Sequence, residues 1–312
     1  MSSQPYIRMH NLKSNYDKFL PIIKESLKEC MLPDGNFQPY KNKPKLSDIE
    51  AVTLAVLAET LGVDSENHLF SKLKTEYSAD FINLPDRSNF NRRRRRLQHY
   101  VMIICDWVAK QVEKDDKVFV IDSMPLPICK PGRVFRSKVC KDDQHVQPAR
   151  SYHAAHKVYY YGFKLQLIVS KQGIPITAGM TAANVHDVKF LGMLDFDEQL
   201  SNCELIGDKG YLSLGYQTTL FDEAKIKLVT PLRSNMKTVL SSWNASYRYT
   251  RKRIETLFSQ LGDQMMLTRN YAKSLDGLFS RIMYKLSAVA VLQWINFSNG
   301  KPINHIKHAL AF

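Results

Sequence analysis

The N-terminal part of the chain carries apolar residues at helical spacing. The first apolar stripe runs from Leu12 to Leu27, and Ser47 with Glu50 three residues later forms a capping-box pattern that begins a second helix. Helices are predicted at residues 12–27, 47–61, 67–77 and about 88–108. The pattern therefore predicts an all-helical region over residues 1–115.

Strands and helices alternate in the rest of the chain. The run from Val118 to Ile121 is continuously apolar, which is typical of a strand covered on both faces, and Pro125 and Pro127 argue against an ordinary central continuation. Further strands are predicted at residues 159–169, 174–180, 203–208 and 227–230, with helices at 188–200, 214–223 and from about 245 and 278. This order predicts an α/β domain over residues 116–298, followed by a tail at 299–312.

Three acidic residues occupy related places in this pattern. Asp122 and Asp208 each follow a predicted strand, and Glu255 lies beside the apolar stripe of a predicted helix. Each aspartate could simply accept hydrogen bonds from backbone N–H groups of a turn. If the strands are neighbours, however, the acids meet at one edge of the sheet, and converging carboxylates are the oxygen ligands that Mg²⁺ prefers. A pair of such ions would suit an in-line phosphoryl displacement.

The net charge of the chain indicates which class of partner it binds. Its 312 residues carry 44 Lys and Arg against 30 Asp and Glu, a net charge of +14, which favours nucleic acid or an anionic membrane surface. No apolar run reaches the roughly 18 residues of a membrane span, and the N-terminus has no signal-peptide core. Five cysteines without CxxC spacing are typical of reduced thiols, so we expect a soluble cytoplasmic protein.

Two basic segments are candidates for DNA contact. The arginine run consists of Arg92, Arg93, Arg94, Arg95 and Arg96, and it covers more than one helical turn, so its side chains cannot all lie on one solvent face. It is either a charged face with internal ion pairs or a contact with the phosphate backbone. The segment 130–157 is also basic. It contains Cys and His residues, but their irregular separations do not match a compact zinc site.

Several blocks of the chain resemble a known family. In order and spacing, VIDSMP, YYGFKLQLIVS, TAGMTAANVHD, IGDKGY and RKRIETLFSQL resemble bacterial insertion-sequence transposases of the DDE type, and the nearest likeness is to the 982 group of insertion sequences. The likeness covers residues 117–297 and continues more weakly in LPDRSNFNRRRRRL. It implies an RNase H-like mixed sheet flanked by helices, preceded by the helical region.

The resemblance also implies functional residues. Asp122, Asp208 and Glu255 match the three catalytic, metal-binding acids, which take two Mg²⁺ ions, with Mn²⁺ as a substitute. Arg251, four residues before Glu255, matches an arginine that contacts DNA phosphate. Gly262 stands where the family's motif often has a lysine. From the residues themselves, Lys209 is a candidate phosphate contact, and His186 and Asp187 could support the site, although Asp187 could equally cap a helix.

The activity implied is Mg²⁺-dependent transposition of a mobile element. The protein would cleave double-stranded DNA at the terminal inverted repeats and join the 3′-hydroxyl ends to target DNA, and pairing of two ends implies a homodimer. We expect it to act at the bacterial nucleoid. One alternative is an RNase H-like nuclease without strand transfer. Another is a non-catalytic DNA-binding protein derived from a transposase, which the presence of all three acids disfavours.

Overall fold

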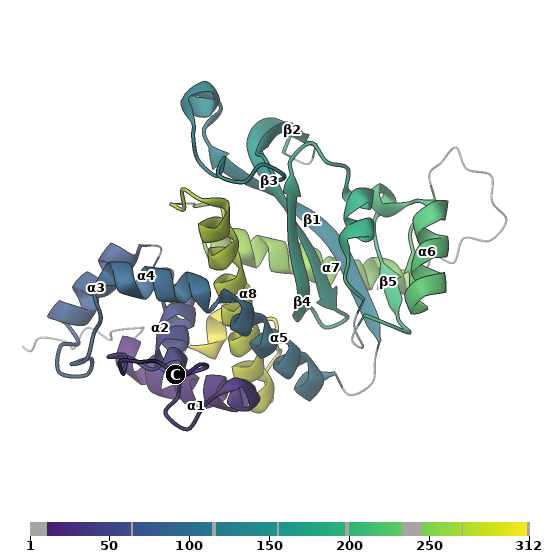
Figure 1. Cartoon of the computed structure of the whole chain (residues 1–312). Helices are drawn as coiled ribbons and strands as arrows, with labels where there is room; N and C mark the ends of the chain where they lie inside the picture. Colours follow the sequence, from purple (N-terminus) through teal and green to yellow (C-terminus); the bar gives the residue numbers. More distant parts are fainter. Residues whose placement is uncertain are drawn as a thin grey trace, which may run out of the picture. The chain divides into compact units, whose positions relative to one another are not determined.

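The chain forms two compact units, which we call the helical unit and the sheet unit. The structure is a computed structural model and describes residues 11–63, 65–113, 117–154, 156–196, 200–232, 245–269 and 271–310. The helical unit comprises residues 1–108 and 280–312, and the sheet unit comprises residues 109–279. Together they make a mixed α/β protein, as expected (Figure 1). The division differs from the predicted ranges 1–115, 116–298 and 299–312, because residues 280–298 pack with the N-terminal helices.

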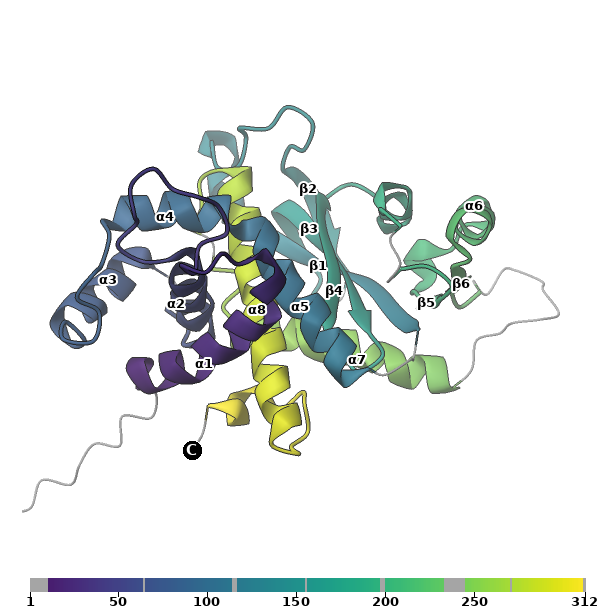
Figure 2. The same cartoon turned by 60° about the horizontal axis from the view of Figure 1, so that its bottom comes forward.

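The helical unit contains the helices that the sequence predicts, one of them divided in two, and two short 3₁₀ helices that the sequence analysis did not predict. It contains α1 (Leu12–Ser26), η1 (Lys28–Cys30), α2 (Asp48–Thr60), α3 (Glu66–Thr75), α4 (Arg87–Arg96), most of α5 (Gln98–Val112), the second part of α8 (Leu275–Ser298) and η5 (Ile306–Ala309) (Figure 2). The predicted capping box at Ser47 and Glu50 is confirmed. The single helix predicted at 88–108 is two helices, because the chain leaves helical geometry at Leu97 between α4 and α5.

Helix α8 is buried on all sides over residues 280–293. The sequence indicated one apolar stripe, but polar side chains on the remaining positions are also enclosed. The Tyr284 hydroxyl donates to the backbone oxygen of Arg94 at 3.0 Å, and the Ser287 hydroxyl donates to that of Val101 at 2.6 Å. Enclosed polar groups are tolerated because they have such partners. These bonds tie α8 to α4 and α5 within the helical unit.

The sheet unit is a six-stranded mixed sheet with helices. Its strands are β1 (Val118–Cys129), β2 (Ala149–His153), β3 (Val158–Ser170), β4 (Pro175–Ala182), β5 (Glu204–Ile206) and β6 (Lys227–Val229). Their order is β2-β3-β1-β5-β6, and β4 pairs with β3. The helices are η2 (Pro131–Arg136), η3 (Asp187–Met193), η4 (Lys209–Tyr211), α6 (Leu214–Ala224) and α7 (Ala245–Asp263). Helix α7 packs against β1, and α6 against β6.

Strand β1 continues through both prolines, which the sequence analysis did not expect. Asp122 therefore lies within the strand, and Pro125 and Pro127 pair with Lys164 and Gly162 of β3. The physical reason is that β5 pairs only with residues 118–120 of β1. Beyond Val120, β1 pairs with β3 on one side and not with β5 on the other. Proline, which has no N–H, is tolerated there because an edge position does not need a hydrogen bond on both sides.

Gly162 allows the strands to come together where the pairing of β1 with β3 shifts. Its φ is +157°, and a Cβ at this position would lie 2.1 Å from the backbone oxygen of Leu126. The register shift falls between Pro127 and Cys129. Only glycine fits such a close approach of two backbones. Gly162 is therefore required by the geometry of the long β1–β3 pair.

Two further parts of the sheet unit differ from the prediction. The helix expected at 188–200 is the short 3₁₀ helix η3, and residues 197–199 lie outside the described part of the chain. Strand β2 lies in the segment 130–157, where the sequence showed no clear period, and it pairs with the first half of β3. Its five residues are too few for a periodic signal to stand out.

Candidate active site

The pairing of β1 with β5 brings Asp122 and Asp208 to equivalent places. The strands are parallel, with Val120 opposite Ile206, and each aspartate stands two residues further along its own chain. Asp208 caps η4, where its side chain accepts a hydrogen bond from the Gly210 N–H at 2.7 Å. The turn-capping role considered for a single aspartate is therefore real for Asp208. It does not explain why a second acid stands at the matching position on β1.

Arg251 connects the third acid to the first. Helix α7 buries Ile254, Leu257 and Leu261, and on its margin the Arg251 Nη2 lies 3.1 Å from Glu255 Oε1 and 3.5 Å from Asp122 Oδ2. The guanidinium is thus placed between the two carboxylates. Glu255 is about half exposed, with 55% of its side chain accessible, whereas Asp122 is mostly enclosed.

Asp187 is a fourth carboxylate beside this group. Its Oδ1 accepts hydrogen bonds from Lys164 Nζ at 2.9 Å and from Gln166 Nε2 at 3.1 Å. Its Oδ2 and the Oδ1 of Asp208 lie 3.5 Å and 2.8 Å from the position that a Cβ on Gly210 would take. Glycine at 210 therefore leaves room for both carboxylates. The neighbouring His186 is exposed at the start of η3, and Lys209 is exposed next to Asp208.

A buried polar network lies beneath the acids, and the sequence analysis missed it. The Tyr211 hydroxyl, fully buried, donates to Gln166 Oε1 at 2.8 Å, and Gln166 in turn donates to Asp187. The network joins the loop after β5 to β3 and η3. A signal was present, because Lys164 and Gln166 are the polar residues two apart in an otherwise apolar stretch of β3. Such an alternation indicates a polar contact on one face of the strand.

The electrostatics of the site reflect the crowding of negative charge. Burial and the Asp208 carboxylate raise the pKa of Asp122 to about 6, with a smaller contribution from Asp187. The Ser123 N–H, which donates to Asp122 at 2.8 Å, and Arg251 act in the opposite direction on that pKa. Burial, followed by the charges of Asp187, Asp122 and Asp208, raises the pKa of Tyr211 well above its ordinary value. The site is therefore short of positive charge.

The donor set fits a hard divalent cation in its chemistry. Asp122 and Asp208 supply carboxylate oxygens, and burial together with the charge of Asp208 disfavours the ionised form of Asp122, so a cation would relieve both effects on Asp122. Among the described residues, no three His, Cys, Asp or Glu side chains are grouped closely enough to hold a metal ion as they stand. Glu255 is instead engaged with Arg251.

In the helical unit, the arginine run is divided between buried and exposed side chains. The Arg94 guanidinium is buried, 2.9 Å from both Glu59 Oε1 and Glu66 Oε1, and that of Arg93 lies 2.6 Å from the buried Asp48. Arg92 and Arg96 are exposed, and Arg95 is partly buried. Internal ion pairs therefore account for Arg93 and Arg94, and the exposed members are the ones accessible to a ligand.

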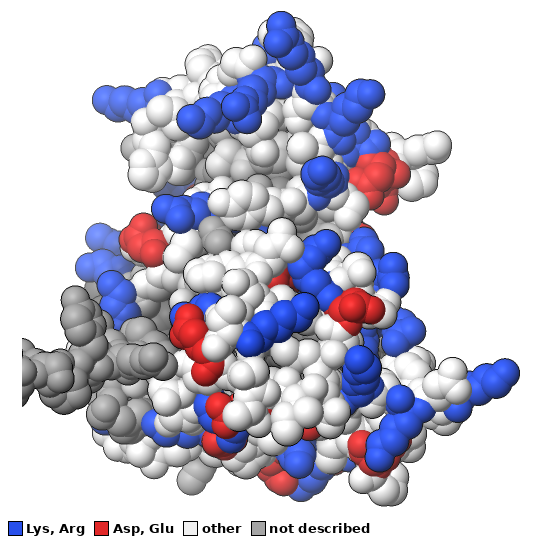
Figure 3. Space-filling model, turned by 90° about the vertical axis from the view of Figure 1, so that its left-hand side faces the viewer, with Lys and Arg blue, Asp and Glu red and all other residues white. Residues whose placement is uncertain are grey.

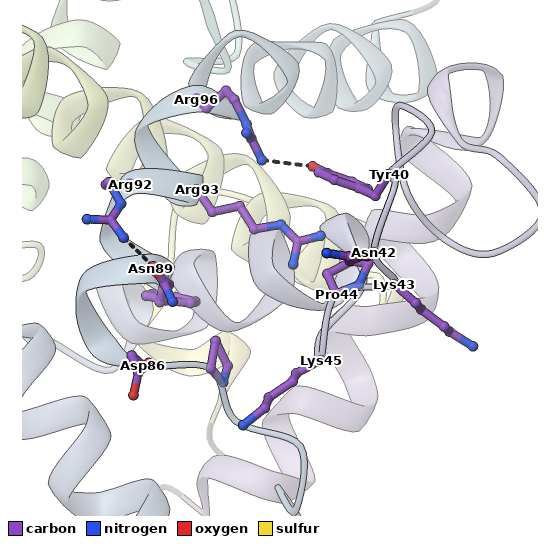
Figure 4. Close-up of a pocket in the computed structure, with 12 residues that line it drawn as sticks. Tyr40, Asn42, Lys43, Pro44, Lys45, Asp86, Asn89, Arg92, Arg93 and Arg96 are labelled. Carbon is purple, nitrogen blue, oxygen red and sulfur yellow. Dashed lines mark hydrogen bonds between the residues drawn. The ribbon is translucent and has the colours of Figure 1, made fainter.

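Arg92 and Arg96 line a basic pocket in this unit. Arg96 donates to the Tyr40 hydroxyl at 3.0 Å, Arg92 contacts Asn89, and Lys43 and Lys45 stand on the facing loop (Figure 4). The pocket has a volume of about 510 Å³. Lys and Arg are spread widely over the face of the molecule in Figure 3, with fewer Asp and Glu. This charge distribution suits a polyanionic ligand.

Comparison with known proteins bears directly on the sheet unit. A family model described as "Transposase DDE domain" matches residues 112–274, which is just over half of the chain and contains the acids of the site. A search of curated proteins found no match, and neither did a search of solved structures. No helix in the described ranges is both long enough and apolar enough to cross a membrane.

The match covers β1, the loop after β5 and α7, which carry these three acids. It supports an enzyme of the transposase or nuclease kind, and it implies binding to DNA. Family members of this kind generally use divalent metal ions. By its sequence over residues 112–274, this chain belongs to the transposase DDE domain family.

Proposed function

We propose that the protein is a Mg²⁺-dependent transposase that cleaves DNA at the terminal inverted repeats of an insertion sequence and joins the 3′-hydroxyl ends to target DNA. The observation that carries the proposal is the equivalent placement of Asp122 and Asp208 on paired parallel strands, with Arg251 linking Glu255 to Asp122. Assignment of the element to the 982 group rests on the sequence resemblance. Action at the bacterial nucleoid, by a homodimer that pairs two element ends, belongs to the same proposal.

Asp122, Asp208 and Glu255 would hold the metal. When bound, Mg²⁺, or Mn²⁺ in its place, supplies Lewis-acid polarisation of the phosphate and a water of lowered pKa, and two ions serve both the attacking and the leaving oxygen. For Glu255 to join the aspartates, its ion pair with Arg251 must give way. Arg251 would then be available to a DNA phosphate. The nearby Lys209 is exposed, which supports a similar role.

The reaction consists of two phosphoryl transfers at one site. In the first, water attacks a phosphodiester at the element end and the 3′-oxygen leaves as a hydroxyl. In the second, that 3′-hydroxyl attacks a phosphodiester of the target, and the target's own 3′-oxygen leaves. Asp187, fixed by Lys164 and Gln166, would keep the loop of Asp208 in place through both steps. His186, exposed beside Asp187, is a weaker candidate for the same support.

The helical unit would supply sequence-independent affinity for DNA. Arg92 and Arg96 are exposed in the basic pocket with Lys43 and Lys45, so they are the members of the arginine run best suited to phosphate contacts. Arg95 is a further candidate. Arg93 and Arg94 would contribute indirectly, because their ion pairs hold α4 in position.

A cleavage and joining assay tests the proposal. The substrate is a labelled duplex carrying the inverted repeat that flanks the gene, with a plasmid as target and Mg²⁺ present. Wild-type protein should cut the repeat and join a pre-cut 3′-hydroxyl end, and Asp122→Ala, Asp208→Ala and Glu255→Ala should each abolish both steps while DNA binding is kept. Asp222→Ala, which removes an exposed acid of α6, is the matched control and should retain activity.

The outcomes separate the candidate functions. Hydrolysis without any joined product would favour an RNase H-like nuclease. Binding without hydrolysis in Mg²⁺ or Mn²⁺ would favour a DNA-binding protein derived from a transposase. Cleavage at ordinary rates by any of the three acid variants would show that the site assignment is wrong.

A further inference from the structure

The ribbon of β2 and β3 exposes large aromatic side chains. Phe135, in η2 just before the ribbon, is 88% exposed, Tyr159 is 73% exposed and Tyr152 is 48% exposed. Full burial of one such side chain removes a large apolar area from water, so leaving three exposed close together is costly. A cluster of exposed aromatic rings on a monomer is a common sign of a binding surface.

These rings form one connected face, which we call the aromatic ribbon face and define as Phe135, Arg150, Tyr152 and Tyr159. Arg150 and Tyr152 are two residues apart on β2 and therefore point to the same side. Tyr152 pairs with Tyr159 across the ribbon, with ring centroids 4.9 Å apart. The Arg150 guanidinium lies over the Phe135 ring, 4.9 Å from its centroid. Figure 1 shows the segment before β2 projecting from the sheet.

The surroundings of this face are positively charged. Residues 130–157 contain seven Lys and Arg and two acids, Asp142 and Asp143. Both acids accept hydrogen bonds from backbone N–H groups: Asp142 from Leu275 at 2.9 Å, and Asp143 from His145 at 2.7 Å. The acids thus serve the local fold, and the face presents rings and cations to a ligand. Anionic ligands with flat rings match this chemistry best.

We propose that the aromatic ribbon face binds unpaired DNA bases by stacking, while the Lys and Arg around it contact the backbone. The proposal rests on the proposed function in one respect, that the ligand is DNA. Base pairs at a cut end fray, and fraying exposes such bases. Aromatic rings add little to a duplex, whose bases are stacked on one another, but they bind the π faces of unstacked bases of any sequence. The Arg150 guanidinium, which lies over the Phe135 ring, adds a cation next to this contact.

The test compares single-stranded and duplex DNA. Fluorescence anisotropy is measured with the full chain and a labelled oligothymidine of about 20 nucleotides, long enough for one binding site, and with a duplex of equal length. Phe135→Ala and Tyr159→Ala should weaken single-strand binding about fivefold or more, and should change duplex binding less than about twofold. Tyr159→Phe retains the ring and should bind as wild type does.

Phe221→Ala is the matched control. Phe221 is 52% exposed on α6, and the Lys225 Nζ lies 5.2 Å from its ring centroid, so it resembles Phe135 in exposure and in its cation. This variant should bind both DNAs as wild type does. Circular dichroism of each variant checks that the fold is retained.

Three results would overturn the inference: equal losses on both DNAs, no loss on either, or loss of self-association instead of DNA affinity, which would make the face a protein contact. The proposed function can fail separately. A wild-type protein that shows no cleavage but the expected single-strand effects would refute transposition and keep the stacking face. If Phe135→Ala and Tyr159→Ala joined DNA normally and kept their single-strand affinity, the stacking face would be refuted and transposition would be kept.

Discussion

Replacing Arg94 with alanine tests whether the arginine run is divided between folding and DNA binding. The Arg94 side chain is 6% exposed, bonds to Glu59 and Glu66, and lies 4.9 Å from the centroid of the Tyr284 ring. Burial alone would raise the pKa of Glu59, but Lys285, Arg94 and Arg281 hold it below its ordinary value. Without Arg94, the buried Glu59 carboxylate keeps its ion pair with Lys285 but loses one of its cationic partners.

The expected cost follows from this geometry. Breaking a buried ion pair by removing one partner costs roughly 3–5 kcal/mol. We expect about 3 kcal/mol for Arg94→Ala, near the lower limit, because Lys285 remains beside Glu59 and Glu66 is partly exposed. Arg92 is exposed, and Arg92→Ala should change the free energy of unfolding by less than about 0.5 kcal/mol.

Urea unfolding followed by tryptophan fluorescence measures the difference. Trp107 and Trp294 both lie in the helical unit, with ring centroids 4.8 Å apart, whereas the third tryptophan, Trp243, belongs to residues 109–279. The measurement is therefore made in a Trp243→Phe background, in which the emission reports on the helical unit. DNA affinity is measured in parallel over a range of salt concentrations. Arg92→Ala and Arg96→Ala should each weaken binding and lower the salt slope by about 1. If Arg94→Ala instead unfolded like wild type and weakened DNA binding as Arg92→Ala does, the division of the run would be refuted.

Two further predictions concern the sheet unit. The pKa of Asp122, about 6 in the folded state against 3.8 for the ordinary group, means that its ionised form destabilises the metal-free fold above pH 6 and that this penalty fades as the pH falls from 6 towards 3.8. Asp122→Asn should therefore stabilise the protein in EDTA at pH 8 by an amount on the order of 2–3 kcal/mol, and it should have little effect near pH 4. Thermal unfolding at the two pH values measures the difference. Equal effects at both pH values would contradict the charge argument. Gly162→Ala should destabilise the sheet unit by roughly 2–4 kcal/mol in denaturant unfolding, because its Cβ would meet the Leu126 oxygen. The control is Gly132→Ala, which should be neutral because nothing lies within 4 Å of the added Cβ. Matching effects of the two variants would rule out the close approach.

Local patterns predicted much of this fold because they act within a few residues. The capping box at Ser47, the apolar run at residues 118–121 and the stripe of α7 are each read from neighbours in sequence. The continuation of β1 through Pro125 depends on partners elsewhere in the fold, because β3 pairs along nearly the whole of β1 while β5 pairs only with residues 118–120. These partners are not visible in the local pattern, so the sequence could not place the end of the strand.

The candidate site shows the same limit. Asp122, Asp208 and Glu255 could be proposed from strand ends, a helix margin and the family likeness, and Arg251 from the family likeness. The sequence did not show that Arg251 lies between Asp122 and Glu255, because the 3.5 Å contact joins residues 129 apart. The burial of Arg94 was equally hidden, since it depends on Glu59 and on the ring of Tyr284.

The helical unit is assembled from two separated stretches of the chain, and this sets an order of events during synthesis. The sheet unit is continuous, so it is complete once residue 279 has left the ribosome, and domains of growing chains generally fold as units as they emerge. At that moment α4 has yet to receive the hydrogen bond from Tyr284, and Glu59 has yet to meet Lys285. A chain truncated ahead of residue 280 therefore keeps its acids but lacks the packing that holds α4. In such a fragment, the side of the basic pocket that α4 forms would lack the support of α8.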